Sequence, residues 1–286
     1  MLRQLGVRPR VQAVVIACDS GSSGRGASNL ARVKRRLLRL LGRAGLLGPA
    51  YRTYERALAL HGRHDRSAVG GLPVPPAELI VRVAGTADVD WFLEGGRLGY
   101  ETVRALVPGE LESVLDFGCG CGRVTRYWLG AGTSVAGSDL NEDAIDWCRR
   151  NLPFARFEEN GLAPPLAFDD GTFDLAYGLS VFTHLPEELQ VGWLHELARV
   201  LRPGGRLLLT THGARYRDRL DAAERERFDA GAIVVRWQEA AGSNLCAAYH
   251  PPGALVRLAD RFEEVAFVPE GARGNPHQDV TVFRRA

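Results

Sequence analysis

A short apolar run that ends in an acidic residue and alternating glycines is the stretch of this sequence best suited to chemistry. The run from Val114 to Gly122 reads VLDFGCGCG. Glycine has no Cβ, so the chain can turn tightly there and a ligand can touch the backbone. We expect a helix over 123–129, whose first N–H groups would point at that ligand. The pattern predicts an α/β fold with a site for a nucleotide-like ligand.

The spacing of the glycines separates two kinds of cofactor. A dinucleotide fingerprint needs G-x-G-x-x-G, and the positions that would hold its last glycine are Arg123 and Thr125. This spacing disfavours an NAD(P)-dependent oxidoreductase, which is kept as an alternative. The spacing that is present is Asp-x-Gly-x-Gly-x-Gly.

Two polar residues follow predicted strands further along the chain. Thr133 to Ser138 reads as a strand, and Asp139 follows it at roughly the 20-residue distance where a carboxylate accepts hydrogen bonds from both ribose hydroxyls. Phe154 to Glu158 is a further short strand, and Asn160 comes just after it. A turn residue and a polar loop are the structural alternatives for these two side chains.

Two more segments complete an ordered series. Phe173 to Leu185 reads as a strand with its exit, and a helix with a Leu-Arg-Pro-Gly-Gly turn leads into an apolar strand over 206–211. From Ser113 to about Gly213 the series resembles the class I S-adenosylmethionine-dependent methyltransferases of the small-molecule type. The resemblance implies a Rossmann-like, doubly wound, seven-stranded sheet with a reversed last hairpin, and S-adenosylmethionine as the cofactor.

The resemblance also implies the contacts of that cofactor. Asp139 would bind the ribose, Asn160 the adenine amino group, and Leu162 would flank the adenine ring. Arg97 is a candidate clamp for the cofactor carboxylate, with an ordinary surface arginine as the alternative. The residues expected to bind the cofactor are Asp116, Gly118, Cys119, Gly120, Gly122, Asp139, Leu140, Asn160, Gly161, Leu162, Leu179 and Arg97.

The methyl group of a sulfonium is already activated, so the protein mainly aligns the reactants and excludes water. An oxygen nucleophile that is protonated at neutral pH also needs a base, usually histidine. His184 is the leading candidate for a catalytic base, with a helix-cap or core role as the alternative, and His212 and His250 are further candidates. A metal-assisted variant that adds His277 and Asp279 lacks any ligand spacing, so no metal is predicted.

The N-terminal part of the chain differs from the rest in charge. We expect a flexible extension over 1–28, a basic amphipathic helical segment and linker over 29–75, and the methyltransferase domain over 76–286. Apolar residues recur at helical spacing from Leu30 to Leu41, among several arginines. Such a helix around 30–45 suits either peripheral membrane contact or a cap with a solvated basic face.

The remaining elements are predicted from periodicity and turn residues. Glu78 to Ala84 reads as a strand or the first turn of a cap, and Val89 to Leu106 as a helix that ends before Pro108. Beyond the ordered series we expect a charged helix over 217–228, an apolar run over 232–237, a helix over 251–262, and closing strands over 265–268 and 280–283.

Composition places the chain among soluble globular proteins. Its 286 residues carry a formal net charge of +2, and 45% of them are apolar. The five cysteines form neither a C-x-x-C pair nor a zinc pattern, which indicates free thiols in a reducing compartment. We therefore expect a cytoplasmic protein, with membrane association as an option through the basic helix.

The acceptor is less well defined by the sequence than the cofactor. We expect O-methylation of a small-molecule or sugar hydroxyl. Nucleic acid is disfavoured because the predicted substrate end has no basic patch. An alternative to an enzyme is a membrane-peripheral or partner-binding module whose cofactor site is vestigial.

Overall fold

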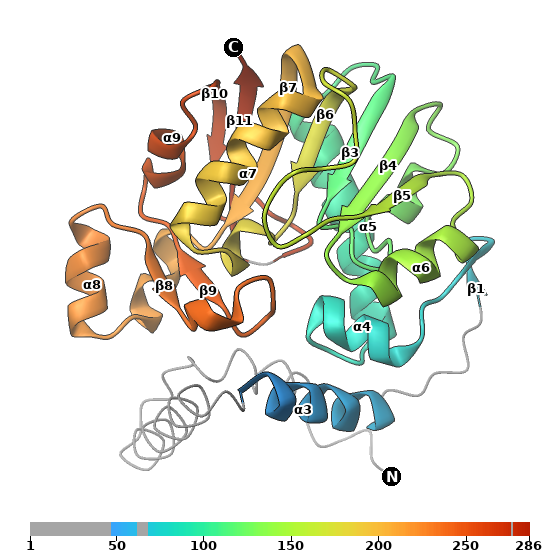
Figure 1. Ribbon diagram of the computed structural model, residues 1–286, viewed down its shortest axis with the longest axis horizontal. Coiled ribbons are helices and arrows are strands. Elements are labelled where there is room, and N and C mark those ends of the chain that lie inside the picture. The colour runs from blue at the N-terminus through green and yellow to red at the C-terminus, as the bar shows by residue number, and fades with distance from the viewer. Residues whose placement is uncertain (1–46, 62–67, 276) are drawn as a thin grey trace.

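The computed structural model describes residues 47–61, 68–275 and 277–286 (Figure 1). The predicted flexible extension over 1–28 and the predicted basic helix around 30–45 therefore lie outside the described residues. Of the segment predicted to be helical over 29–60, the part that is described forms α3 (Leu47–His61).

One seven-stranded sheet organises the fold. Its strand order is β10-β11-β7-β6-β3-β4-β5. The parallel strands are β3 (Ser113–Phe117), β4 (Ser134–Asp139), β5 (Arg156–Glu159), β6 (Phe173–Gly178) and β7 (Leu201–Thr211). The antiparallel pair β10 (Phe262–Val268) and β11 (Asp279–Arg285) closes one edge. The predicted doubly wound α/β fold with a reversed last hairpin is confirmed.

The central strands are apolar because both faces of the sheet are covered. Val114, Leu115 and Leu175 are fully buried. One face packs against α7 (Glu187–Val200) and α9 (Ala254–Leu258). The other packs against α4 (Ala77–Ala84), α5 (Val89–Leu106) and α6 (Glu142–Asn151). In Figure 1, α7 crosses the sheet on the side that faces the viewer.

Local sequence signals set the ends of these helices. Asp88 caps α5 by accepting a hydrogen bond from the Trp91 N–H, and Asn141 caps α6 through the Ala144 N–H. The acidic first turn of α6 suits the positive end of the helix, as expected from the sequence. Helix α4 ends at Gly85, which adopts the left-handed conformation (φ 66°).

The structure decides between two alternatives for one predicted segment and corrects the length of two predicted helices. The segment over 78–84 is the helix α4, which decides between the two alternatives considered. The helix predicted over 123–129 is only one 3₁₀ turn, η2 (Thr125–Trp128), because Gly130 and Gly132 follow with positive φ and the chain turns away. The helix predicted over 251–262 is shorter, since α9 ends at Leu258 and β10 begins at Phe262.

Smaller elements gather around the carboxyl ends of the parallel strands. They are the hairpin of β8 (Val234–Arg236) and β9 (Ala247–Tyr249), the helix α8 (Ala222–Asp229), the hairpin of β1 (Ala68–Val69) and β2 (Leu72–Pro73), and the 3₁₀ turns η3 (Phe182–His184), η4 (Ala214–Arg219) and η5 (Gln238–Ala240). Figure 1 shows α3 below the β8–β9 hairpin and α4. Among the described helices, none combines the length and the apolar character needed to cross a bilayer.

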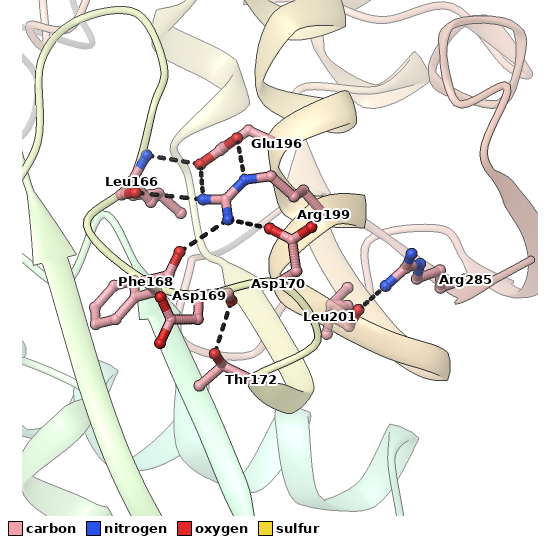
Figure 2. Close-up of polar contacts among 9 residues, drawn as sticks. All are labelled: Leu166, Phe168, Asp169, Asp170, Thr172, Glu196, Arg199, Leu201 and Arg285. Atoms are coloured by element: carbon pink, nitrogen blue, oxygen red, sulfur yellow. Dashed lines mark hydrogen bonds and ion pairs between the residues drawn. The ribbon is translucent and has the colours of Figure 1, made fainter.

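A part-buried ion pair holds the long loop between β5 and β6 against α7 (Figure 2). Glu196 accepts a hydrogen bond from the Leu166 N–H at 2.7 Å and pairs with Arg199 at 2.6 Å. Arg199 also donates to the Phe168 carbonyl at 2.9 Å and pairs with Asp170. The loop is thereby fixed at several points, which positions its first residues at the carboxyl edge of the sheet.

Candidate active site

A cavity of about 1590 Å³ opens at the carboxyl ends of the parallel strands. Its walls come from the loops after β3, β4, β5, β6 and β7, from α3, α4 and α5, and from the segment that joins β8 to β9. In doubly wound folds this edge is where ligands bind. Its volume exceeds what one small ligand needs, so two molecules can fit side by side.

The glycine loop forms the floor of one half of this cavity. Gly118 and Gly120 have φ values of 74° and 52°, a region that other residues rarely adopt. A Cβ on Gly118 would lie 2.3 Å from Val181, and one on Gly120 would lie 2.6 Å from Val83. Gly122 does not line the cavity, because it packs against Leu152, the residue that follows α6. Its predicted contact with the cofactor is therefore not supported by its position.

Asp139 lies at the end of β4 and faces the cavity. Its Oδ2 accepts a hydrogen bond from the Gly120 N–H at 2.7 Å, and its Oδ1 accepts one from the Asn141 N–H at 2.9 Å. Burial raises the pKa of this carboxyl group, and the backbone donors oppose that shift. Each oxygen keeps a further lone pair, so a fixed carboxylate is available to ligand hydroxyls.

An apolar slot lies beside Asp139. Leu140 and Leu162 line the cavity and are 45% and 42% exposed. A Cβ on Gly242, in the segment between β8 and β9, would lie 2.9 Å from a methyl carbon of each leucine. Asn160 borders the slot; its Oδ1 accepts from the Ser138 hydroxyl and its Nδ2 donates to the Gly161 carbonyl at 2.7 Å. A flat heterocycle fits such a slot, with the amide at its edge.

Asp116 is buried beneath the glycine loop. It accepts a hydrogen bond from the Thr125 hydroxyl at 2.6 Å, and burial raises its pKa to about 6. Cys119 and Cys121 are also buried, and burial raises the pKa of both thiols well above its ordinary value. Thiols in this state are poor nucleophiles, so the two cysteines act as small packing residues.

A polar network follows β6 on the other half of the cavity. Ser180 has a φ of 65°, and its N–H donates to the Thr210 hydroxyl at 2.7 Å. Gln278 donates to the Ser180 hydroxyl at 2.8 Å and accepts from Thr210 at 2.7 Å. Sequence reasoning did not assign Ser180, Thr210 or Gln278 to the site. The positive φ of Ser180 and its long-range partners leave no signal in the local sequence.

His184 faces the cavity at the end of η3. Its Nδ1 lies 2.7 Å from the carbonyl oxygen of Cys246, so this nitrogen carries the proton and donates. Burial lowers the pKa of His184, which leaves the ring neutral at pH 7 with an unprotonated Nε2. His212 also lines the cavity, 6.5 Å from His184 between ring centres, and burial lowers its pKa well below its ordinary value.

Besides Gly122, the structure places two further predicted site residues away from the cavity. His250 is buried and its Nε2 lies 3.0 Å from Oε1 of Gln190, so it serves the core instead of the reaction. Arg97 is part-exposed on α5 and pairs with Glu94 and Glu101, one turn away on either side. These acidic partners draw its side chain away from the face of α5 that borders the cavity.

The arginine that borders the glycine loop is Arg123, whereas Arg97 lies outside the cavity. It lines the cavity, lies over the Trp91 ring at 4.7 Å and donates to Oδ1 of Asn275 at 3.1 Å. Sequence reasoning used Arg123 only to exclude a dinucleotide fingerprint. Within the ranges that the structure describes, no three His, Cys, Asp or Glu side chains are grouped to hold a metal ion.

Known proteins that resemble this chain are methyltransferases. Residues 114–205 match the family model described as "Methyltransferase domain". The fatty-acid O-methyltransferase of Mycolicibacterium smegmatis is 38% identical over 136 residues, which cover 46% of this chain and 47% of that protein. The malonyl-[acyl-carrier protein] O-methyltransferase of Pectobacterium atrosepticum is 33% identical over 144 residues, covering 47% and 52%. The chain thus spans about half the length of these curated relatives.

A solved structure shows the same fold. The crystal structure of 1,6-didemethyltoxoflavin-N1-methyltransferase from Burkholderia thailandensis, with its substrate and S-adenosylhomocysteine bound, aligns with a TM-score of 0.51 and 21% identity over 70% of this chain and 81% of that one. Fold and site together define an α/β protein with a large ligand cavity at the carboxyl ends of its parallel strands. Over residues 114–205 the chain matches the methyltransferase domain family, and the relatives named above are methyltransferases. The cofactor of this family is S-adenosylmethionine.

Proposed function

We propose that this chain transfers a methyl group from S-adenosylmethionine to an oxygen atom of a small-molecule acceptor. The observation that carries the proposal is the convergence of the glycine loop, Asp139, the leucine slot and His184 on one cavity. When bound, the cofactor supplies an activated methyl group on a sulfonium.

The residues at the loop half of the cavity fit an adenosyl group. Gly118 and Gly120 line the cavity and have positive φ values that other residues rarely adopt. Asp139 offers two aligned oxygens for the ribose hydroxyls. Leu140 and Leu162 form a slot for the adenine ring, with Asn160 at its edge. The chain's own contribution there is to orient the cofactor and to exclude water.

His184 is the proposed base at the other half. Since Nδ1–H is held by the Cys246 carbonyl, Nε2 has a lone pair for a proton. The acceptor hydroxyl would give its proton to Nε2 as its oxygen gains the methyl group, and S-adenosylhomocysteine would be released. His212 lies behind His184 and is a secondary candidate.

The acceptor remains a proposal at the level of its class. The relatives named above act, by their names, on a fatty acid and on malonyl-[acyl-carrier protein], which supports an oxygen acceptor. A sugar hydroxyl belongs to the same proposal but has no support from these names. The basic helix around 30–45 lies outside the described residues, so no observation favours membrane contact. A cytoplasmic location and domain limits of 76–286 are likewise proposals.

Calorimetry with S-adenosylmethionine and with NAD tests the proposal. We expect binding of the first and none of the second; the reverse result would overturn the assignment.

Asp139→Ala should weaken S-adenosylmethionine binding by about 10- to 100-fold, which is the usual contribution of hydrogen bonds to a charged group. Asp146→Ala is the matched control, because Asp146 is a half-exposed acid on α6 that does not line the cavity. Equal affinities of the two variants would refute the ribose role.

A further inference from the structure

A row of rings leads from the proposed base to a guanidinium. The His212 ring lies 6.5 Å from the ring of His184 and 4.2 Å from the ring of Tyr216. The guanidinium carbon of Arg219 lies 4.3 Å from the centre of the Tyr216 ring. All four residues line the cavity. This row forms one wall of the half that the proposed cofactor site leaves open.

Arg219 differs from the other arginines of its own turn. On η4, Arg215 lies 3.9 Å from Glu270, and Arg217 donates to Asp229 at 2.6 Å. Within the described part of the chain, Arg219 has no carboxylate at ion-pair distance, and its guanidinium rests only on the Tyr216 ring. A half-buried cation that faces a cavity without a counter-ion is suited to bind an anion there.

The acidic side chains of this wall do not supply that counter-ion. Glu224 is engaged by Arg236 at 2.8 Å and by the Asp221 N–H at 2.8 Å. Asp221 accepts from the Glu224 N–H at 3.0 Å and so caps α8. Glu239 is exposed on η5. Asp221 and Glu224 therefore have partners of their own, and among the described residues none of the three acids lies at ion-pair distance from Arg219.

We infer that the acceptor has a planar apolar body and an anionic end, with the anion bound by Arg219 and the methyl-accepting oxygen at His184. This inference rests on the proposed function and names the class of its substrate. The apolar body would lie along the rings of His212 and Tyr216. The anion is a carboxylate or a phosphate, since a guanidinium binds either with two parallel hydrogen bonds.

Three probe molecules test this inference. They share a phenol ring and differ only in the group at the other end of the molecule, which is a carboxylate, an alcohol or a phosphate. They are para-hydroxyphenylpropionate, its neutral alcohol para-hydroxyphenylpropanol, and para-hydroxyphenylpropyl phosphate. Their affinities are measured by calorimetry with S-adenosylhomocysteine present at saturation. The wild-type protein should bind at least one anion about tenfold more tightly than the alcohol. The anion that binds more tightly identifies the group that the acceptor carries.

Arg219→Gln should bring the anion and the alcohol to nearly equal affinity. Arg217→Gln is the matched control from the same turn, and it should keep the preference because Arg217 pairs with Asp229. A wild-type protein that binds no anion more tightly than the alcohol overturns the inference. So does an Arg219→Gln variant that keeps the preference. Binding of S-adenosylhomocysteine alone is measured for each protein, so failure of the proposed function is seen separately.

Discussion

At the scale of single residues, the site depends on polar groups that are held by backbone hydrogen bonds and still have a free acceptor position facing the cavity. Asp139 ties the glycine loop to the turn after β4 through two backbone N–H groups, and its orientation is fixed before any ligand arrives. His184 is held in the same way by the Cys246 carbonyl. Such fixed groups need no reorganisation on binding, which is the condition for efficient alignment.

The role of His184 can be tested by Asn, which keeps an N–H donor for the Cys246 carbonyl but offers no basic nitrogen. His184→Asn should lower kcat for methylation of para-hydroxyphenylpropionate by about 100-fold, a usual value for loss of a general base. The pH profile gives a second readout. Burial lowers the pKa of His184 below its ordinary value, so the wild-type rate should stay constant through neutral pH and fall only at more acidic pH, as the base is protonated.

The Asn variant should show no such fall with decreasing pH. An equal fall in both proteins would assign the titration to another group. An unchanged kcat would mean that the accepting oxygen is already ionised, as a carboxylate is, and needs no base. The affinity for S-adenosylhomocysteine serves as the control, because His184 is not among the residues proposed to hold the adenosyl group.

At the scale of elements, the sequence predicted best what depends on local spacing. The parallel strands and the edge position of Asp139 follow from apolar runs and from the polar residues that end them. What it could not predict comes from contacts between distant segments. Gln278, for example, reaches Ser180 across 98 positions. The pairing of Arg97 with Glu94 and Glu101 is local, by contrast, and the helical spacing of these three residues could have indicated it.

The close approach of α5 to the glycine loop gives a prediction of its own. A Cβ on Gly96 would lie 2.1 Å from the carbonyl oxygen of Arg123, an atom of the backbone. Gly96→Ala should therefore destabilise the protein by about 1–3 kcal/mol through overpacking, although alanine is the better helix former. Thermal unfolding measures the effect, and weaker S-adenosylhomocysteine binding should accompany it because the loop shifts.

The matched control is a helical glycine with space around it. Gly192 of α7 is such a position, since the nearest atoms to an added Cβ are 3.7 Å away in Pro164. Gly192→Ala should stabilise the protein by about 0.5–1 kcal/mol, because alanine loses less backbone freedom on folding. If both variants were stabilised equally, the packing argument for α5 would be wrong.

At the scale of the whole molecule, the cavity has walls from outside the segment that matches the family. That match ends at residue 205, whereas Arg219, Gly242 and Gln278 lie beyond it and line the cavity. On the other side of the chain, α3 contributes Tyr51 and Tyr54, although the sequence placed this region before the predicted domain. The residues proposed to hold the adenosyl group thus lie in the matched segment, and segments on both sides of it complete the walls of the cavity.

Removing α3 should therefore open the site without unfolding the sheet. The main apolar clusters of the sheet contain no residue of α3. A variant lacking residues 1–67 should unfold cooperatively but bind para-hydroxyphenylpropionate about tenfold more weakly. Loss of roughly 55 Å² of apolar contact is enough for that change. A variant lacking residues 1–46 keeps α3 and should bind the probe like the intact chain. If the shorter deletion alone abolished binding, the segment before α3 would have to form part of the site.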